Sequence, residues 1–190
     1  MFDPILKRLA APLLARGAQP LGRLGADLVS LAGLVVGIAA IPAIARHAYL
    51  LGLALLILNR LIDALDGAVA RQTRATGRGA FLDMTFDLIV FAGLPFAFAL
   101  ADPSRGLAAA FFVFAIAARG ASEVFAAMLS QRIVFDFVGR VMEDTELTLA
   151  FAIACIMPGW FSLIAYVAGA LCFLTAGARF ALALSRFEQS

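Results

Sequence analysis

Most of the chain consists of long apolar segments, separated by short stretches that contain charged residues, proline or glycine. A helix needs about 20 mainly apolar residues to cross the roughly 30 Å hydrocarbon core of a bilayer. The pattern therefore predicts six transmembrane helices, of which the fifth is the shortest. Their expected ranges are residues 28–45, 48–70, 80–100, 107–129, 146–157 and 161–184, with a tight turn at 158–160 before the last.

Residues 4–23, which precede these segments, alternate basic and apolar positions. This pattern predicts a short amphipathic helix on the membrane surface, with Lys7, Arg8 and Arg16 toward lipid phosphates. Charged residues and prolines interrupt any early apolar core, so we expect no cleavable signal peptide. Asp27 or Ser30 is expected to cap the first span.

The composition supports a membrane protein, because 63% of the 190 residues are hydrophobic, 15% are charged and the mean hydropathy is +0.97. Soluble domains are nearer half apolar and a quarter charged. We therefore predict an all-α polytopic membrane protein with one domain, 1–190. The net charge of +2 and the lack of a basic run argue against nucleic-acid binding. Cys155 and Cys172 lie in apolar runs, which indicates buried small side chains rather than a disulfide.

The basic residues are distributed unequally between the two sides that six spans define. The loops on one side offer only Arg46 and Arg105, beside the interfacial His47. The positive-inside rule places the opposite side, with both termini, at the cytoplasmic face. The basic residues on that side are Lys7, Arg8, Arg16, Arg23, Arg71, Arg74, Arg78, Arg132, Arg140 and Arg186.

One stretch, residues 59–87, differs from the rest because it carries four aspartates, four arginines and three glycines. Asp63 and Asp66 are three residues apart, and Asp83 and Asp87 are four apart. Such spacings put each pair on one helix face. Two helices joined by a short turn would bring all four carboxylates together, at a site whose oxygen ligands suit Mg²⁺ or Mn²⁺.

Neighbouring residues in this stretch fit a ligand site. Gly67 leaves room for a ligand to approach the helix backbone, and Arg71 offers a guanidinium fork for phosphate oxygens. Gly79 permits close packing where the two helices meet. An ion pair between Arg60 and Asp63 would be a purely structural explanation for those two residues. It does not extend to the whole set, because four acids exceed the nearby buried arginines.

The pattern D-x-x-D-G-x-x-A-R followed by G-x-x-x-D-x-x-x-D resembles the signature of the CDP-alcohol phosphatidyltransferases. All eight positions are present, although the spacer from Arg71 to Gly79 has seven residues where eight are usual. This departure affects only which loop residue lines the nucleotide pocket. The length, the six spans and the N-terminal surface helix also resemble this family. The sequences of the two motif segments, NRLIDALDG and RGAFLDMTFD, are most similar to those of a small bacterial branch. The eight positions are Asp63, Asp66, Gly67, Ala70, Arg71, Gly79, Asp83 and Asp87.

The resemblance implies transfer of a phosphoryl-alcohol group from a CDP-alcohol, often CDP-diacylglycerol, to an acceptor hydroxyl, with release of CMP. It implies a homodimer in a bacterial inner membrane. It also implies two divalent cations, Mg²⁺ or Mn²⁺. No cysteine or histidine lies near the four aspartates in the sequence, so we expect a direct in-line attack without a covalent intermediate. Asp87 would be the base that takes the acceptor's proton. The implied metal ligands are Asp63, Asp66, Asp83 and Asp87, and the implied CDP-alcohol contacts are Asp66, Gly67, Ala70, Arg71, Thr76 and Gly79.

Other polar residues leave alternatives open. The run 139–146, with Gly139, Arg140, Glu143, Asp144 and Glu146, would either recognise the acceptor headgroup or form a solvated loop. Asp27 and Ser30, read mainly as a cap, would otherwise touch the nucleotide. Arg119 and Glu123, four apart on the fourth span, favour a structural ion pair.

Two other functions compete with the transferase. A cation-coupled transporter would also use intramembrane aspartates, but it usually shows internal symmetry and charges near the membrane midplane. The acids here lie toward one face, and the halves of the chain show no repeat. An inactive relative is disfavoured because no acid of the pattern is missing. The acceptor stays open among glycerol phosphate, inositol phosphate, serine, a choline-like alcohol and another phospholipid.

Overall fold

The computed structural model describes residues 26–73, 77–130 and 142–187, which form six α-helices and two short 3₁₀ helices without a strand. No predicted span boundary differs from the observed one by more than three residues. The predicted surface helix at 4–23 lies outside the described residues. The helices are α2 (Ala26–Ala45), α3 (Tyr49–Thr73), α4 (Gly77–Ala101), α5 (Gly106–Ser130), α6 (Asp144–Ile156) and α7 (Phe161–Phe187), with η1 (Pro103–Arg105) before α5 and η2 (Pro158–Trp160) before α7.

Four of these helices are long and apolar enough to cross a membrane, namely α2, α4, α5 and α7. Helix α3 has 25 residues, but its apolar stretch is interrupted by Arg60, Asp63 and Asp66. Helix α6 has only 13 residues and is about 20 Å long at 1.5 Å per residue. The predicted all-α membrane fold is confirmed, and the six predicted spans differ in how completely they could cross the bilayer.

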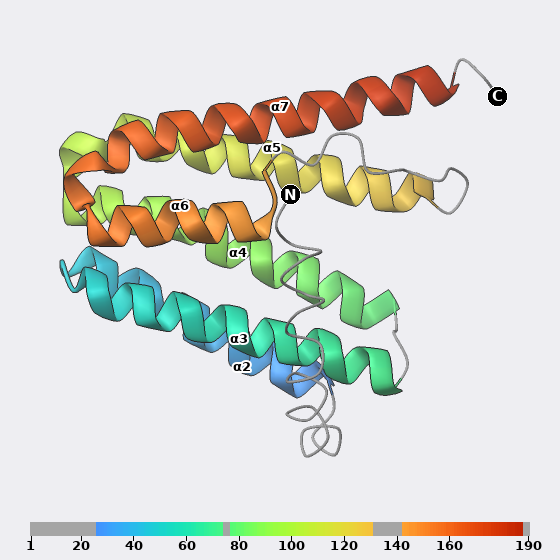
Figure 1. Ribbon diagram of the computed structural model, residues 1–190, viewed down its shortest axis with the longest axis horizontal. Helices are drawn as coiled ribbons and strands as arrows, with labels where there is room; N and C mark the ends of the chain where they lie inside the picture. Colours follow the sequence, from blue (N-terminus) through green and yellow to red (C-terminus); the bar gives the residue numbers. More distant parts are fainter. Residues whose placement is uncertain (1–25, 74–76, 131–141, 188–190) are drawn as a thin grey trace.

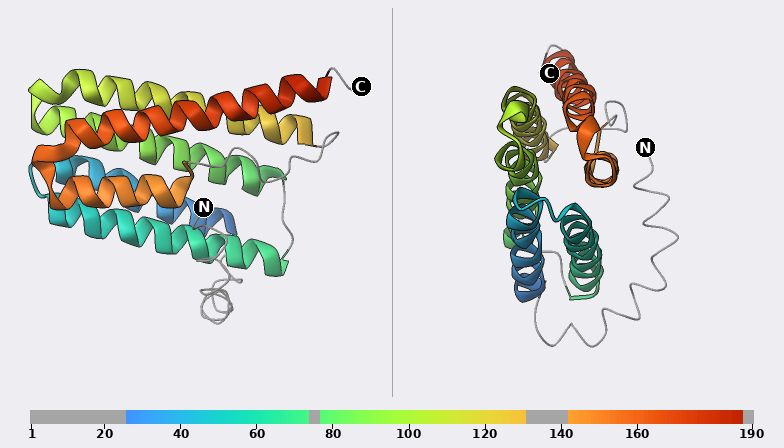
Figure 2. Two further views of the ribbon diagram at one scale, coloured as in Figure 1. Left: turned by 45° about the horizontal axis from the view of Figure 1, so that its top comes forward. Right: turned by 90° about the vertical axis from the view of Figure 1, so that its left-hand side faces the viewer.

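The helices run antiparallel in sequence order, and the α2–α3, α4–α5 and α6–α7 connections meet at one end (Figure 1). Viewed from that end, α2, α4 and α5 form one row, and α3, α6 and α7 form the other (Figure 2). Within the first row α4 packs on α2 and α5, and across the rows α2 packs on α3 and α5 on α7. The ends of α3 and α5 and the starts of α4 and α6 therefore share the opposite end of the bundle.

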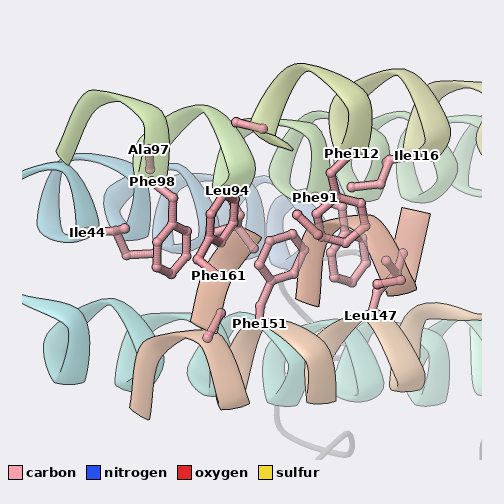
Figure 3. Packing of buried hydrophobic residues seen from close by; sticks show 14 of the residues in the cluster. Ile44, Phe91, Leu94, Ala97, Phe98, Phe112, Ile116, Leu147, Phe151 and Phe161 are labelled. Atoms are coloured by element: carbon pink, nitrogen blue, oxygen red, sulfur yellow. The ribbon is translucent and has the colours of Figure 1, made fainter. Parts of the chain in front are cut away.

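Stacked phenylalanines fill the space between the two rows (Figure 3). The ring centroids of Phe98 and Phe161 are 4.3 Å apart, and those of Phe112 and Phe151 are 5.2 Å apart. The ring centroids of Phe91 and Phe151 are 6.3 Å apart, and Phe91 extends the stack toward the end of the bundle where α3 ends and α4 begins, called the polar end below. Aromatic side chains bury large areas, so this stack fixes α4 against α6 and α7.

The start of α2 corrects one expectation from the sequence. Because α2 begins at Ala26, Asp27 and Ser30 both lie inside the helix, and neither is its cap. The Ser30 hydroxyl instead donates a hydrogen bond to Asp66 on α3. A single sequence cannot distinguish the two roles, because a hydroxyl near a helix start suits a cap as well as a contact between helices.

Candidate active site

The candidate site is a pocket at the polar end of the bundle, between α2, α3 and α4. Helices α3 and α4 both pack against α2, which therefore forms one wall of the pocket. The Asn59 amide on α3 donates a 2.8 Å hydrogen bond to the backbone carbonyl of Gly33 on α2. The pocket is lined by Ser30, Gly33 and Leu34 of α2, by Asn59, Ile62 and Asp63 of α3, and by Asp83, Phe86 and Asp87 of α4.

Three carboxylates meet in this pocket. Asp63 comes from α3, whereas Asp83 and Asp87 lie one turn apart on α4. Each offers one ligand oxygen, and these oxygens all lie within 4.8 Å of one another. A cation bound at about 2.1 Å would draw its ligand oxygens to within about 4.2 Å of one another, a small adjustment for aspartate side chains, and hard divalent ions prefer carboxylate oxygens. The three aspartates therefore fit the predicted cation site.

The fourth aspartate of the pattern is placed differently. Asp66 lies almost one turn beyond Asp63 on α3, is only 7% exposed and accepts the hydrogen bond from Ser30. It is close enough to Asp83 for an electrostatic interaction. The structure thus brings three of the four acids into one group and sets Asp66 beside it, toward α2.

Arg60 contacts the three grouped aspartates, but its main partner is not Asp63, the residue that the sequence suggested. Its guanidinium donates to both oxygens of Asp87, with Nη1 3.1 Å from Oδ2. The nearest contact to Asp63 is longer, at 3.8 Å. The expected partner lies on the same helix, whereas the observed partner lies on α4, because the inward-facing sides of the two helices meet across the pocket.

The remaining residues of the pattern continue the polar end of α3 and α4. Gly67 lies on α3 and is half-buried, and Gly79 lies in the first turn of α4. Ala70 and Arg71 belong to the last turns of α3, but their side chains lie outside the description of the structure. Thr76 also lies outside the described residues. Gly67, Ala70, Arg71 and Gly79 therefore lie on the same two helices as the carboxylates, nearer the end of α3 and the start of α4.

A second polar group, a set of charged side chains, lies where α5, α6 and α7 meet. Arg119 of α5 donates a 2.7 Å hydrogen bond to Asp144, at the start of α6. Its contact with Glu123, the partner expected from the sequence, is 3.4 Å. Arg179 of α7, which the sequence reasoning missed, lies 3.6 Å from Glu123. An ionisable residue within an apolar span is the signal that could have identified it.

Asp144 connects the two polar groups electrostatically. Its carboxylate is held by Arg119 and is near enough to Asp63, Asp83 and Asp87 to repel their carboxylates weakly. Glu143 instead caps α6 in a capping box with Glu146, whose side chain accepts a 3.1 Å hydrogen bond from the Glu143 backbone. The run 139–146 was expected either to recognise the acceptor headgroup or to form a solvated loop. Asp144 is not part of a solvated loop, because it begins α6 and pairs with Arg119. Gly139 and Arg140 lie outside the described residues.

Comparison with known proteins identifies relatives over most of the chain. The family model described as CDP-alcohol phosphatidyltransferase matches residues 23–183. The inner membrane protein YnjF of Escherichia coli (strain K12) is 36% identical over 188 residues, which cover 92% of this chain and 91% of YnjF. The archaetidylinositol phosphate synthase of Methanothermobacter thermautotrophicus is 41% identical over 87 residues, 45% of this chain and 42% of that protein.

A solved structure has the same fold. The crystal structure of Mycobacterium tuberculosis phosphatidylinositol phosphate synthase (PgsA1) with CDP-DAG bound matches with a TM-score of 0.70. The match covers 92% of both chains at 21% sequence identity. This likeness shows a common helical architecture.

Proposed function

Since this chain belongs to the CDP-alcohol phosphatidyltransferase family, we propose that it transfers a phosphatidyl or other substituted phosphoryl group from a CDP-alcohol to an acceptor hydroxyl in a metal-dependent reaction that releases CMP. Membership in this family makes the chain an enzyme of phosphatidyl transfer in phospholipid synthesis. The cation-coupled transporter is accordingly set aside. The observation that carries the metal-dependent mechanism is the meeting of three pattern aspartates from two helices, with ligand oxygens within 4.8 Å.

Asp63, Asp66, Asp83 and Asp87 are the proposed ligands of two divalent cations, Mg²⁺ or Mn²⁺. The fit rests on donor chemistry, because carboxylate oxygens are the ligands that hard cations prefer. When bound, the cations would neutralise the donor's pyrophosphate and the charge that develops on the leaving CMP. Without a counter-charge the three grouped carboxylates repel one another, and Arg60 supplies only one positive charge against them.

Asp87 is the proposed base. The acceptor oxygen attacks the phosphorus that carries the donor alcohol, the bond from that phosphorus to the CMP oxygen breaks, and Asp87 takes the acceptor's proton. Phosphoryl transfer depends on positioning and charge neutralisation more than on covalent chemistry. Neither cysteine serves as a nucleophile at this site, because Cys155 and Cys172 are buried in the apolar core. A direct in-line displacement is therefore proposed.

The nucleotide is proposed to lie over the ends of α3 and α4. Gly67 and Gly79 would let it approach the helix backbones, and Arg71 would offer its guanidinium to the diphosphate. Asp66, Ala70 and Thr76 complete the proposed contacts. The hydrogen bond from Ser30 to Asp66 supports an extension of this site onto α2.

The acceptor alcohol is proposed to bind beside Asp144. The support is the 2.7 Å hydrogen bond that fixes its carboxylate to the buried Arg119, at a position near enough to repel the three grouped aspartates weakly. The identity of the alcohol depends on this second polar group rather than on the eight-position pattern.

We choose CDP-diacylglycerol as the first donor to test, because the solved structure of the same fold has CDP-DAG bound. An inner-membrane location is supported by the name of the similar Escherichia coli protein and by the four helices long enough to cross a membrane. We further propose that the carboxylate end faces the cytoplasm, as the excess of arginines at that end favours. A homodimer is proposed on family resemblance alone.

The decisive experiment measures CMP release by the purified protein from CDP-diacylglycerol with Mg²⁺ or Mn²⁺ and a pool of candidate alcohols. We expect acceptor-dependent release that Asp87→Asn abolishes while the protein stays folded, as its helical circular dichroism should show. Asp102→Asn is the matched control, because Asp102 precedes η1 at the opposite end of α4 and should leave release unchanged. A second arm uses soluble CDP-alcohols as donors. Absence of release in both arms, with no binding of cytidine nucleotides, would contradict the proposed function.

A further inference from the structure

Arg60 is the strongest feature of the site that the eight-position pattern does not include. It lies on α3 one turn before Asp63, and its side chain is 15% exposed. Nη1 and Nη2 donate to Oδ2 and Oδ1 of Asp87, so the guanidinium forms a two-pronged contact with the proposed base. Such contacts fix the plane of a carboxylate as well as its charge.

The guanidinium is itself held on its other edge and on one face. The side-chain oxygen of Asn59 accepts hydrogen bonds from Nε at 2.9 Å and from Nη2 at 2.8 Å. Asn59 is in turn anchored to the Gly33 carbonyl of α2 at 2.8 Å. The guanidinium carbon lies 4.8 Å from the centre of the Phe91 ring, within the range of a cation–π contact. A hydrogen-bonded chain thus runs from α2 through α3 to Asp87 on α4.

This arrangement limits how Asp87 can bind a cation. An ionised carboxylate has about four lone-pair positions, two on each oxygen. The fork of Arg60 occupies one position on each oxygen, so the carboxylate cannot turn both oxygens fully toward a cation. One oxygen can still bind the cation at its second position, and the other keeps a position for an incoming hydroxyl.

We propose that Arg60 is a positioning residue that prevents Asp87 from chelating the cation with both oxygens and so keeps one carboxylate oxygen available to the acceptor's proton. The inference rests on the proposed function, in which Asp87 is both a cation ligand and the base. The proposed role of Arg60 depends on the two parallel hydrogen bonds that the guanidinium donates to Asp87, and not only on its positive charge. A plain neutralising role for Arg60 would be filled equally well by lysine.

The test compares Arg60→Lys with the native enzyme in two measurements. The first is Mn²⁺ binding to the purified protein by electron paramagnetic resonance, without substrate. Lysine keeps the charge but is a point donor that holds one oxygen. We expect Arg60→Lys to bind Mn²⁺ more tightly, by about threefold or more, because the released oxygen joins the cation. An affinity equal to that of the native protein would overturn the proposal.

The second measurement is turnover with CDP-diacylglycerol and the acceptor found by the alcohol screen. We expect kcat of Arg60→Lys to fall by about tenfold or more, with the KM of the donor little changed, because only the orientation of Asp87 is lost. Native kcat, or a change confined to the donor's KM, would overturn the proposal. Arg105→Lys is the matched control, since Arg105 pairs with Asp102 at 3.0 Å at the other end of α4.

Two further variants keep the outcomes separable. Asn59→Ala removes the lateral holder of the guanidinium without changing any charge, so it should also lower kcat while the protein still binds Mn²⁺. If Arg60→Lys does not fold, native kcat in Asn59→Ala overturns the proposal. Turnover in Asp87→Asn would contradict the proposed base itself. An inactive Asp87→Asn beside an Arg60→Lys that behaves like Arg105→Lys would refute only the role of Arg60.

Discussion

Arg119 of α5 and Asp144 of α6 form a 2.7 Å ion pair that ties the short helix α6 to the rest of the bundle. The two partners differ in burial, because the Arg119 side chain is 6% exposed and that of Asp144 is 41% exposed. Removing the exposed partner leaves a buried charge, whereas removing the buried partner leaves a charge that water can reach. The two substitutions should therefore have unequal effects.

We expect Asp144→Ala to lower the free energy of unfolding by about 2 kcal/mol, since among the described residues Arg119 then keeps only the 3.4 Å contact with Glu123. Arg119→Met should cost no more than about 1 kcal/mol, because methionine fills the buried volume and Asp144 stays hydrated. The measurement is equilibrium unfolding in detergent. A larger loss in Arg119→Met than in Asp144→Ala would show that packing of the arginine stem matters more than its charge.

Asp66→Asn should weaken metal-dependent binding of cytidine nucleotides by about tenfold or more, because an amide replaces an anionic ligand. The Ser30 hydroxyl can still donate to the amide oxygen, so the protein should remain folded. The measurement is binding of a CDP-alcohol by calorimetry over a series of Mg²⁺ concentrations. Unchanged magnesium dependence would contradict the role of Asp66 as a cation ligand, and Asp102→Asn again serves as the control.

The contact between α2 and α4 depends on a glycine. A Cβ added at Gly37 would lie 2.5 Å from Cγ2 of Val90 and 3.0 Å from Nδ2 of Asn59. Gly37→Ala should therefore push α2 from α4 and lower the free energy of unfolding by about 1–3 kcal/mol. It should also disturb the Asn59 amide that anchors Arg60, and so reduce turnover.

Gly177→Ala is the matched control for Gly37→Ala. A Cβ at Gly177, on α7, meets nothing within 4 Å. Alanine favours a helix over glycine by up to about 1 kcal/mol, so this variant should be as stable as the native protein or slightly more stable. Equal thermal midpoints for the two variants would contradict the close packing of α2 against α4.

Removal of divalent cations should abolish turnover and lower the thermal midpoint of the purified protein. The reason is the repulsion among the three grouped carboxylates, which Arg60 only partly neutralises. Chelation followed by return of Mg²⁺ or Mn²⁺ should restore both properties. Asp83→Asn should reduce the stabilising effect of added cation, whereas a midpoint that never responds to cations would contradict a cation site at these aspartates.

Local patterns in the sequence were sufficient to predict the helices. Apolar length, proline and glycine positions set the span boundaries to within three residues, because helix formation and burial in lipid depend on consecutive residues. The spacing of Asp83 and Asp87 likewise predicts that they share a face of α4. The eight-position pattern also identified the family, since its residues are defined by spacing along the chain.

Only the tertiary structure decided which helix faces meet. The sequence paired Arg60 with Asp63 and Arg119 with Glu123, each within one helix, whereas the shorter contacts are with Asp87 and Asp144 on other helices. Ser30 was read as a cap, but it contacts Asp66 across α2 and α3. Such contacts depend on the rotation and depth of each helix, which are set by packing among distant segments, such as the phenylalanine stack and the close approach at Gly37. No local spacing encodes these quantities.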